Sequence, residues 1–174
     1  KKVRAKIALS TTTIVLTLAL LAKLSLTHGF RAVALYYWAP YMWTNAWLVL
    51  YTWLQHTDPS VPQYGEDEWT FIKGALTTID RPYGIFDFFH HKIGSTHVAH
   101  HMFHEMPFYK ADEATAALKE FLGPLYNYDP THWVLAMWRI ARTCHYVEGL
   151  EGVQYYKSIE DLPPSVVGGE AKKN

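Results

Sequence analysis

The chain has 174 residues, of which 49% are apolar and 16% aromatic, and its 16 basic side chains balance 16 acidic ones. A disordered tail needs low hydrophobicity and a nucleic-acid-binding domain needs an excess of positive charge, so the composition argues against both. The chain has 10 histidines and a single cysteine, which excludes a disulfide scaffold and a thiolate zinc site. We therefore expect any bound metal to be held by imidazole.

Two long apolar segments occupy the first third of the chain. Residues 7–26 are mostly apolar, and residues 32–54 contain no charged residue at all. A helix of about 20 apolar residues is long enough to cross the hydrocarbon core of a bilayer. The sequence thus predicts two transmembrane helices within residues 1–55, with a kink at Pro40 in the second. A short polar link at residues 27–29 would join them into a hairpin.

The charges that flank the two segments predict their orientation. Four of the first six residues are basic, whereas the link between the segments offers only Arg31, with Lys23 at its edge. By the positive-inside rule, both ends of the hairpin and the bulk of the chain then face the cytosol. A signal peptide is the alternative for the first segment, but no small-residue cleavage site is obvious and a second apolar run follows directly.

Residues 56–157 are more polar and predict a helical cytosolic cap. Proline, glycine and aspartate mark loops near residues 58–59, 62–67 and 80–82. Helices are expected over 85–104, with a break at Gly94, over 112–122, and after Thr131, which could cap the last of them. Residues 158–174 are expected to be a flexible tail. The predicted fold class is therefore all-α, a membrane hairpin followed by a helical cap that carries a metal site.

Six of the 10 histidines lie between residues 90 and 104, and His97, His100 and His101 form the centre of this group. On a helix, His97 and His101 lie one turn apart on the same face, while the adjacent pair points about 100° apart. Three imidazoles would thus converge from one turn and still diverge enough to reach two metal ions. Imidazole ligands without thiolate favour iron, copper or zinc, and the spacing does not choose among them.

The remaining histidines have weaker signals. An isolated histidine is more often a hydrogen-bonded core residue than a ligand, and we interpret His28, His132 and His145 in this way. The roles of the neighbours of the central group, His90, His91 and His104, stay open.

Short segments over most of the chain resemble those of one enzyme family. They are LQHTDP at 54–59, GAL at 74–76, TIDR at 78–81, THVAHH at 96–101, MPFY at 106–109, ADEAT at 111–115, AMWR at 136–139 and YVE at 146–148. Together they resemble the C-terminal part of the membrane fatty acid desaturases. Among these, the sequence is most similar to the microsomal oleate Δ12 (ω-6) acyl-lipid desaturases of fungi and plants.

The resemblance implies a di-iron centre built from three histidine boxes, of which this sequence contains only the third. It implies that His97, His100 and His101 bind iron and that His56 completes the shell, with no catalytic residue beyond these ligands. The implied reaction is the O2-dependent introduction of a cis double bond at the Δ12 position of oleoyl chains in membrane lipids. The implied electron donor is cytochrome b5 with its reductase, and the implied location is the endoplasmic reticulum membrane.

Carboxylates near the histidine box could hydrogen-bond the ligand rings and fix their tautomers. The candidates are Asp58, Asp80, Asp87 and Glu105, and the sequence does not rank them.

Because only one box is present, we expect the chain to be a C-terminal portion whose missing N-terminal part carries the other two. The isolated 174 residues are then expected to be inactive and to bind iron poorly. The alternatives are a divergent relative that makes a hydroxyl, epoxide, conjugated diene or triple bond, and a different di-iron membrane enzyme such as a sterol or carotenoid hydroxylase. A truncated membrane protein without activity is the third alternative.

Overall fold

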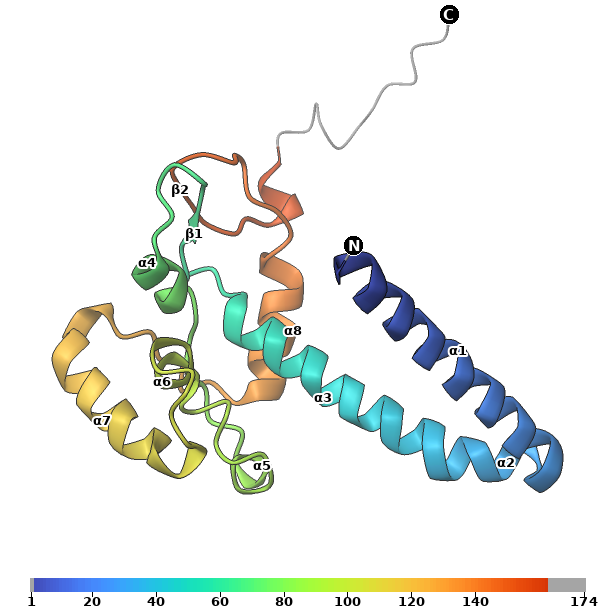
Figure 1. The fold of residues 1–174 in the computed structure, drawn as a ribbon. Coiled ribbons are helices and arrows are strands. Elements are labelled where there is room, and N and C mark those ends of the chain that lie inside the picture. Colours follow the sequence, from blue (N-terminus) through green and yellow to red (C-terminus); the bar gives the residue numbers. More distant parts are fainter. Residues whose placement is uncertain (1, 163–174) are drawn as a thin grey trace, which may run out of the picture. The chain divides into compact units, whose positions relative to one another are not determined.

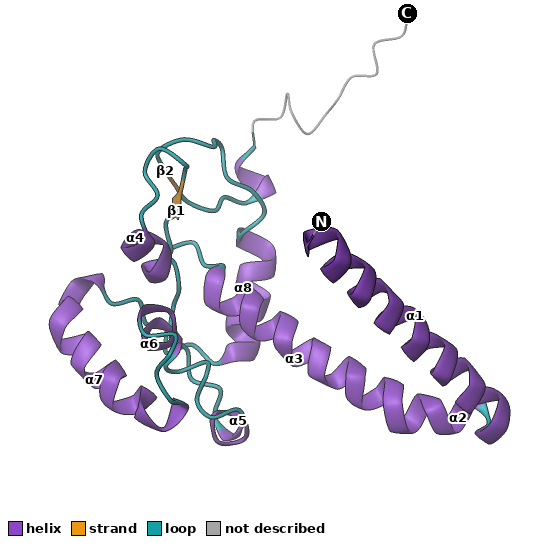
Figure 2. Ribbon diagram, in the orientation of Figure 1, coloured by secondary structure: helices purple, strands orange, loops and turns teal. Residues whose placement is uncertain are grey.

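The computed structural model describes residues 2–162 and is mostly helical (Figures 1 and 2). The chain divides into two compact units, residues 1–49 and residues 50 onward. The elements, in chain order, are α1 (Lys2–His28), α2 (Phe30–Val33), η1 (Ala34–Trp38), α3 (Ala39–His56), β1 (Gln63–Tyr64), α4 (Phe71–Leu76), α5 (Ile85–Phe89), α6 (His97–Met102), η2 (Phe108–Lys110), α7 (Ala111–Leu122), η3 (Gly123–Leu125), α8 (Trp133–Thr143), β2 (Val153–Gln154) and η4 (Ile159–Asp161).

Helix α1 of the first unit is long and apolar enough to cross a bilayer. It has 27 residues, a mean hydropathy of 1.9 over its most apolar stretch, and one buried side chain, Leu21. A helix that is apolar on all sides and exposed is suited to contact with lipid rather than water. Within residues 2–162 it is the one helix that meets this criterion, so the predicted second span at 32–54 remains a prediction.

The second apolar run is helical in three consecutive pieces. Helix α1 continues through His28, and the backbone turns at Gly29, which has φ +85°, so the link is shorter than expected. The π-helical turn η1 ends two residues before Pro40. Proline donates no hydrogen bond and its ring clashes with the carbonyl four residues earlier, and a widened turn relieves that clash. The structure thus has a π-helical turn just before Pro40, and the kink predicted at this proline stays a prediction.

The second unit consists of short helices joined by long loops (Figure 1). Helix α6 contacts both α4 and α7, and a small apolar core forms around Val98, Ala99 and Leu118. Strands β1 and β2 pair antiparallel over two residues each, with Gln63 opposite Gln154. The prediction of a mainly helical protein is confirmed, but the sequence did not predict this strand pair or helix α4.

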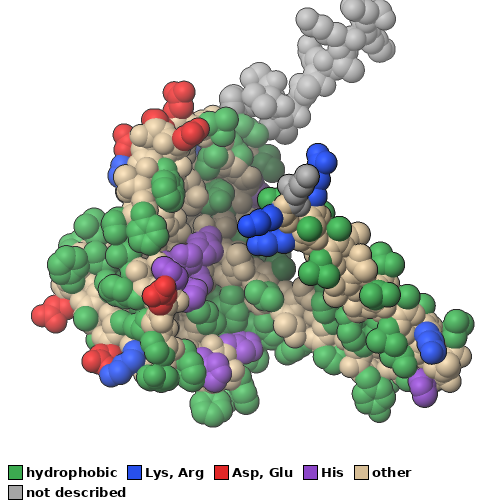
Figure 3. Space-filling view, viewed as in Figure 1, with side chains coloured by type: hydrophobic (Ala, Val, Ile, Leu, Met, Phe, Trp, Pro, Cys, Tyr) green, Lys and Arg blue, Asp and Glu red, His purple; other side chains and the backbone are tan. Residues whose placement is uncertain are grey.

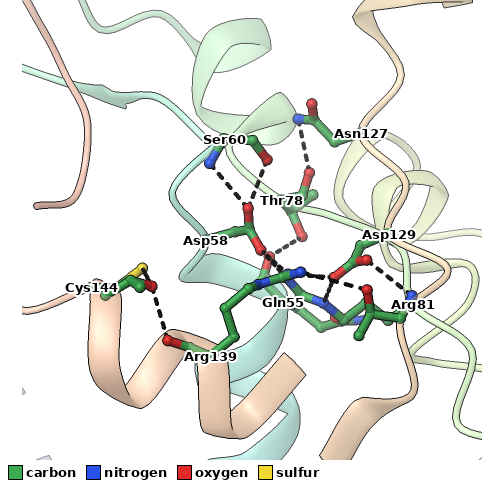
Figure 4. Close-up of polar contacts among 11 residues, drawn as sticks. Gln55, Asp58, Ser60, Thr78, Arg81, Asn127, Asp129, Arg139 and Cys144 are labelled. Atoms are coloured by element: carbon green, nitrogen blue, oxygen red, sulfur yellow. Dashed lines mark hydrogen bonds and ion pairs between the residues drawn. The ribbon is translucent and has the colours of Figure 1, made fainter. Parts of the chain in front are cut away.

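A buried ionic network ties the loops of this unit together (Figure 4). The fully buried Arg81 donates hydrogen bonds to Asp58 and, over 3.0 Å, to Asp129. Arg139 of α8 donates to the same two carboxylates, over 2.9 and 2.6 Å. Although burial alone would raise it, hydrogen bonds from Thr131, Arg81 and Arg139 hold the pKa of Asp129 well below its ordinary value. The network thus joins the loop after α3, the loop between α4 and α5, the loop before α8 and α8 itself.

Two of the expected helices differ from the prediction, and a third agrees. The helix expected over 85–104 is broken from His90 to Thr96, because His91 and Lys92 adopt positive φ angles of 52° and 60°. The break therefore begins four residues before Gly94. Helix α7 agrees with the expected 112–122 to within one residue and ends at Gly123, which has φ +51°.

The cap of α8 is His132 and not Thr131. The His132 Nδ1 atom accepts the Val134 N–H over 3.4 Å. Thr131 is engaged elsewhere, since its own N–H is donated to the Asp129 carboxylate over 3.0 Å. Of the predicted tail at 158–174, residues Ile159–Asp161 form the 3₁₀ turn η4, and residues 163–174 lie outside the described residues.

Gly94 is required by a close approach of two aromatic rings. A Cβ atom at this position would lie 2.3 Å from the Tyr83 ring and 2.8 Å from the Tyr51 ring. We expect Gly94→Ala to lower the free energy of unfolding by about 1–3 kcal/mol, because overpacking displaces buried rings. Gly149→Ala is the matched control, since its Cβ would meet only the end of the Gln154 side chain, at 3.1 Å. Chemical denaturation in detergent measures the free energy of unfolding of the two variants. Equal values for Gly94→Ala and Gly149→Ala would contradict the expectation.

Candidate metal centre

Three histidines from two helices bring their ring nitrogens together in the second unit. His56 is the last residue of α3, and His97 and His101 lie one turn apart on α6. The Nε2 atom of His97 lies 3.2 Å from that of His56 and 3.1 Å from that of His101. Histidine side chains gather on the visible face of this unit in Figure 3. The helical turn predicted from the spacing of His97 and His101 therefore forms, and His56 joins it.

Backbone carbonyls determine which nitrogen of two of these rings carries the hydrogen. The Nδ1 atom of His56 lies 3.3 Å from the Thr77 carbonyl, and that of His97 lies 3.2 Å from the Ile93 carbonyl. A carbonyl oxygen only accepts, so each Nδ1 must be the donor, and each Nε2 then presents a lone pair. Two lone pairs that face each other over 3.2 Å repel unless a cation lies between them.

The spacing of the nitrogens fits a bound metal ion. With metal–imidazole distances of about 2.1 Å, two ligands on one ion lie roughly 3.0 Å apart at a right angle and about 3.4 Å apart at the tetrahedral angle. The separations of 3.1 and 3.2 Å fall between these values. The ligand atoms of His56, His97 and His101 all lie within 4.8 Å of one another. This donor set of neutral imidazoles suits iron, copper or zinc.

Burial keeps these imidazoles neutral. Together with the neighbouring histidines, it lowers the pKa of His97 to about 3 and that of His101 to about 4. Burial also lowers the pKa of His56, against the hydrogen bond to Thr77. At neutral pH the three rings therefore offer lone pairs for which protons do not compete.

The fourth predicted ligand, His100, lies outside this group. Its ring centroid is 5.6 Å from those of both His97 and His101, and its side chain is exposed. This divergence of His100 from His101 is the one expected for adjacent residues on a helix. The structure thus brings three of the four predicted ligands together and leaves the fourth beside them, so its assignment remains a prediction.

The undecided histidines have other contacts. His90 shares a hydrogen bond of 2.9 Å with the Tyr51 hydroxyl, the His91 ring lies 4.3 Å from the Phe108 ring, and His104 is exposed beside Glu105. His28, His132 and His145, which we interpreted as core residues, are exposed. His132 and His145 nevertheless form hydrogen bonds with the backbone.

The structure separates the four candidate carboxylates by what they contact. Asp58 belongs to the ionic network, Asp87 accepts the Tyr83 N–H, and Glu105 is exposed beside His104. Asp80 accepts the Val98 N–H at the start of α6. The acceptors found for His56 and His97 are instead main-chain carbonyls, which sequence reasoning missed because a carbonyl leaves no signal in residue type.

Comparison with known families assigns the class of protein. Residues 1–134 match the family described as fatty acid desaturase, which is more than half of the chain. The chain therefore belongs to the fatty acid desaturase family. No solved structure matches it.

The particular relatives are enzymes of fatty acid modification from fungi and plants. The chain is 50% identical to the Delta(12) fatty acid desaturase of Mortierella alpina over 134 residues, which are 76% of this chain and 34% of that protein. It is 50% identical to the endoplasmic reticulum omega-6 fatty acid desaturase of Brassica juncea over 70% of this chain and 32% of that protein. It is 43% identical to the oleoyl-12-hydroxylase of Ricinus communis over 85% of this chain and 37% of that protein. The chain thus spans about a third of the length of these relatives.

The low pKa of His97 makes the metal-free chain sensitive to acid. An unfolded histidine has a pKa of about 6.5, so below that pH the unfolded chain binds a proton that folded His97, with a pKa of about 3, does not. The contribution of neutral His97 to stability is therefore complete above pH 6.5, and it is lost progressively as the pH drops towards 3. Between pH 7 and pH 5, we expect proton binding by His97 in the unfolded chain to lower the free energy of unfolding by up to about 2 kcal/mol.

Chemical denaturation of the metal-free chain and of His97→Phe at the two pH values measures this effect. The variant keeps a buried ring but cannot bind a proton, so its loss of stability should be smaller by that amount. Equal losses in the two proteins would contradict the burial of a neutral His97.

Proposed function

We propose that this chain is part of an acyl-lipid Δ12 desaturase, which converts oleoyl to linoleoyl chains in membrane lipids. The observation that carries the proposal is the convergence of His56, His97 and His101 in a chain of the fatty acid desaturase family. The names of the relatives from Mortierella alpina and Brassica juncea support the Δ12 (ω-6) position. The balanced reaction takes one oleoyl chain, O2, two electrons and two protons to one linoleoyl chain and two water molecules.

The histidines would hold iron. We assign His56, His97 and His101 to one ion and His100 to a second, because the exposed His100 ring lies outside the converging three. Bound iron would supply the oxidising power, drawn from O2 and electrons, that removal of hydrogen from an unactivated methylene requires. These four side chains do not fill the coordination shells of two ions. We therefore propose that the 174 residues alone are inactive and bind iron poorly.

The protein's own contribution is to keep the imidazoles neutral and correctly turned. The Thr77 and Ile93 carbonyls hold the Nδ1 hydrogens of His56 and His97, so that both Nε2 lone pairs point at one place. Burial removes water from His97, which is 8% exposed. Rings that are oriented before a metal binds need little rearrangement when it does.

An apolar hollow beside His101 supports a lipid substrate. It has a volume of about 280 Å³ and is lined by Trp69, Phe71, Gly74, Ala75 and Thr77 together with His101. Such a surface suits a hydrocarbon chain better than a polar substrate. We place the acyl chain of the lipid against this wall.

The membrane setting follows from the two apolar segments. We propose that residues 7–26 and 32–54 span the endoplasmic reticulum membrane as a hairpin and that the bulk of the chain faces the cytosol. Helix α1 and the name of the relative from Brassica juncea support this location. Family membership supports an external electron carrier, which we propose to be cytochrome b5 with its reductase.

Hydroxylation of the same oleoyl position is the second candidate function. The oleoyl-12-hydroxylase of Ricinus communis matches 85% of the chain, more than the Mortierella desaturase does. The two reactions share the substrate, the oxidant and the histidines, and they differ in whether a hydroxyl group is added or a second hydrogen is removed.

The fatty acids made in yeast distinguish these functions. The complete reading frame that encodes this chain, expressed in yeast without polyunsaturated fatty acids, should yield linoleate, detected by gas chromatography with mass spectrometry. The 174 residues expressed alone should yield no new fatty acid. A hydroxylated product would select the second candidate, and no product from the complete frame would reject both.

Loss of a single ligand should abolish the activity. In the complete protein, His97→Ala, His100→Ala or His101→Ala should each remove all detectable linoleate and leave membrane insertion intact. His104→Ala is the matched control, because this exposed histidine lies outside the converging group and should retain most of the activity. Activity that survives in all three ligand variants would reject the assignment.

A further inference from the structure

Helix α6, which carries the histidine turn, begins without a cap from its own sequence. It is six residues long, and its N-cap residue, Thr96, makes no capping hydrogen bond. The Thr96 hydroxyl is donated instead to the Lys92 carbonyl over 2.8 Å. The first N–H groups of a helix have no partner within it, so a short buried helix depends on an outside acceptor.

That acceptor is Asp80, which lies 17 residues before His97. Its Oδ1 atom accepts the Val98 N–H over 2.8 Å, and its Oδ2 atom accepts the hydroxyl of Tyr126. The residue is fully buried. A carboxylate is well suited to this place, because the N-terminus of a helix carries a partial positive charge.

The backbone around Asp80 is fixed on both sides. The Asp80 N–H is donated to the Asn127 carbonyl over 3.1 Å, and the Asp80 carbonyl accepts the Asp129 N–H over 3.0 Å. A carboxylate held at its main chain and by Tyr126 has little freedom to follow α6 if the helix shifts. Asp80 therefore determines where α6 begins.

The same segment is bonded to the end of the helix that carries His56. The Thr78 hydroxyl and the Ile79 N–H are both donated to the Gln55 carbonyl, each over 3.0 Å. Residues 78–80 thus contact the residue before His56 at one end and the residue after His97 at the other. They set the distance between the two helices whose histidines converge.

We propose that Asp80 is a positioning residue for the metal centre, which holds α6 so that the Nε2 atoms of His97 and His101 meet that of His56. The inference rests on the proposed function only in taking these histidines as metal ligands. The Asp80 carboxylate would act on the ligand histidines through its hydrogen bond with the Val98 amide, and not through a bond to an imidazole ring.

Two measurements on the 174-residue chain in detergent test this role. The first is the exchange rate of the Val98 amide proton, followed by NMR of the metal-free chain labelled with ¹⁵N-valine. The Val61 amide, which is donated to the Asp58 carbonyl, serves as the reference for opening elsewhere in the unit. The second is titration with Co²⁺, whose visible absorption reports both affinity and coordination geometry.

We expect Asp80→Ala to increase Val98 exchange at least tenfold relative to Val61, to weaken Co²⁺ binding at least tenfold and to change its spectrum. Asp80→Asn retains an oxygen acceptor, so it should restore part of the Val98 protection and part of the Co²⁺ affinity. Asp129→Asn is the matched control, because it removes another buried carboxylate that makes no side-chain contact with α6. It should lower stability but leave the Val98 to Val61 ratio and the Co²⁺ spectrum within twofold of the unaltered chain.

The proposal is overturned if Asp80→Ala retains the original Val98 exchange or the original Co²⁺ affinity, or if Asp129→Asn changes both as strongly. A chain that binds no Co²⁺ at all would show that His56, His97 and His101 do not hold an ion without the rest of the protein, and this outcome is distinct from the first. Val98 exchange would then decide alone whether Asp80 holds α6.

Discussion

The second unit depends on two arginines and two aspartates that share one buried space. Arg81 and Arg139 both bond to Asp58 and Asp129, so that two positive charges balance two negative ones around the fully buried Arg81, with Arg139 partly exposed at the edge. Charges in such a place are costly unless they are paired. The loops that bear them cannot separate without exposing an unpaired charge to an apolar surrounding. Short helices with a small apolar core are thereby held in one arrangement, including the ends of α3 and α6 that meet at the histidines.

The histidine rings at that meeting point need restraint from the rest of the unit. The Nε2 lone pairs of His56 and His97 face and repel each other, so their arrangement is unfavourable in itself and suits a cation. The rest of the unit supplies the restraint, through carbonyl acceptors for two rings and a carboxylate at the start of α6. The three histidines are thus only part of the candidate metal centre. The other part consists of groups that prevent the rings from turning away.

Local spacing predicted those features of the site that lie within one helix, and missed those that join distant segments. The turn that pairs His97 with His101 and the helix ending at Gly123 follow from helical periodicity. His56 lies 41 residues from His97, and only the family resemblance linked the two. The break that begins at His90 was missed because the positive φ angles of His91 and Lys92 have no signal in residue type. The cap of α8 shifted by one residue because Asp129 had already engaged Thr131.

The acceptors that orient the rings of His56 and His97 are main-chain atoms, and this has a consequence for how such enzymes can diverge. A substitution at position 77 or 93 changes the side chain but keeps the carbonyl that holds the imidazole. Thr77 also lines the hollow beside His101. Mutation can therefore reshape the hollow while the orientation of the His56 and His97 rings persists. A scaffold of this kind can change the surface beside its histidines in small steps, without passing through forms in which these rings have turned away.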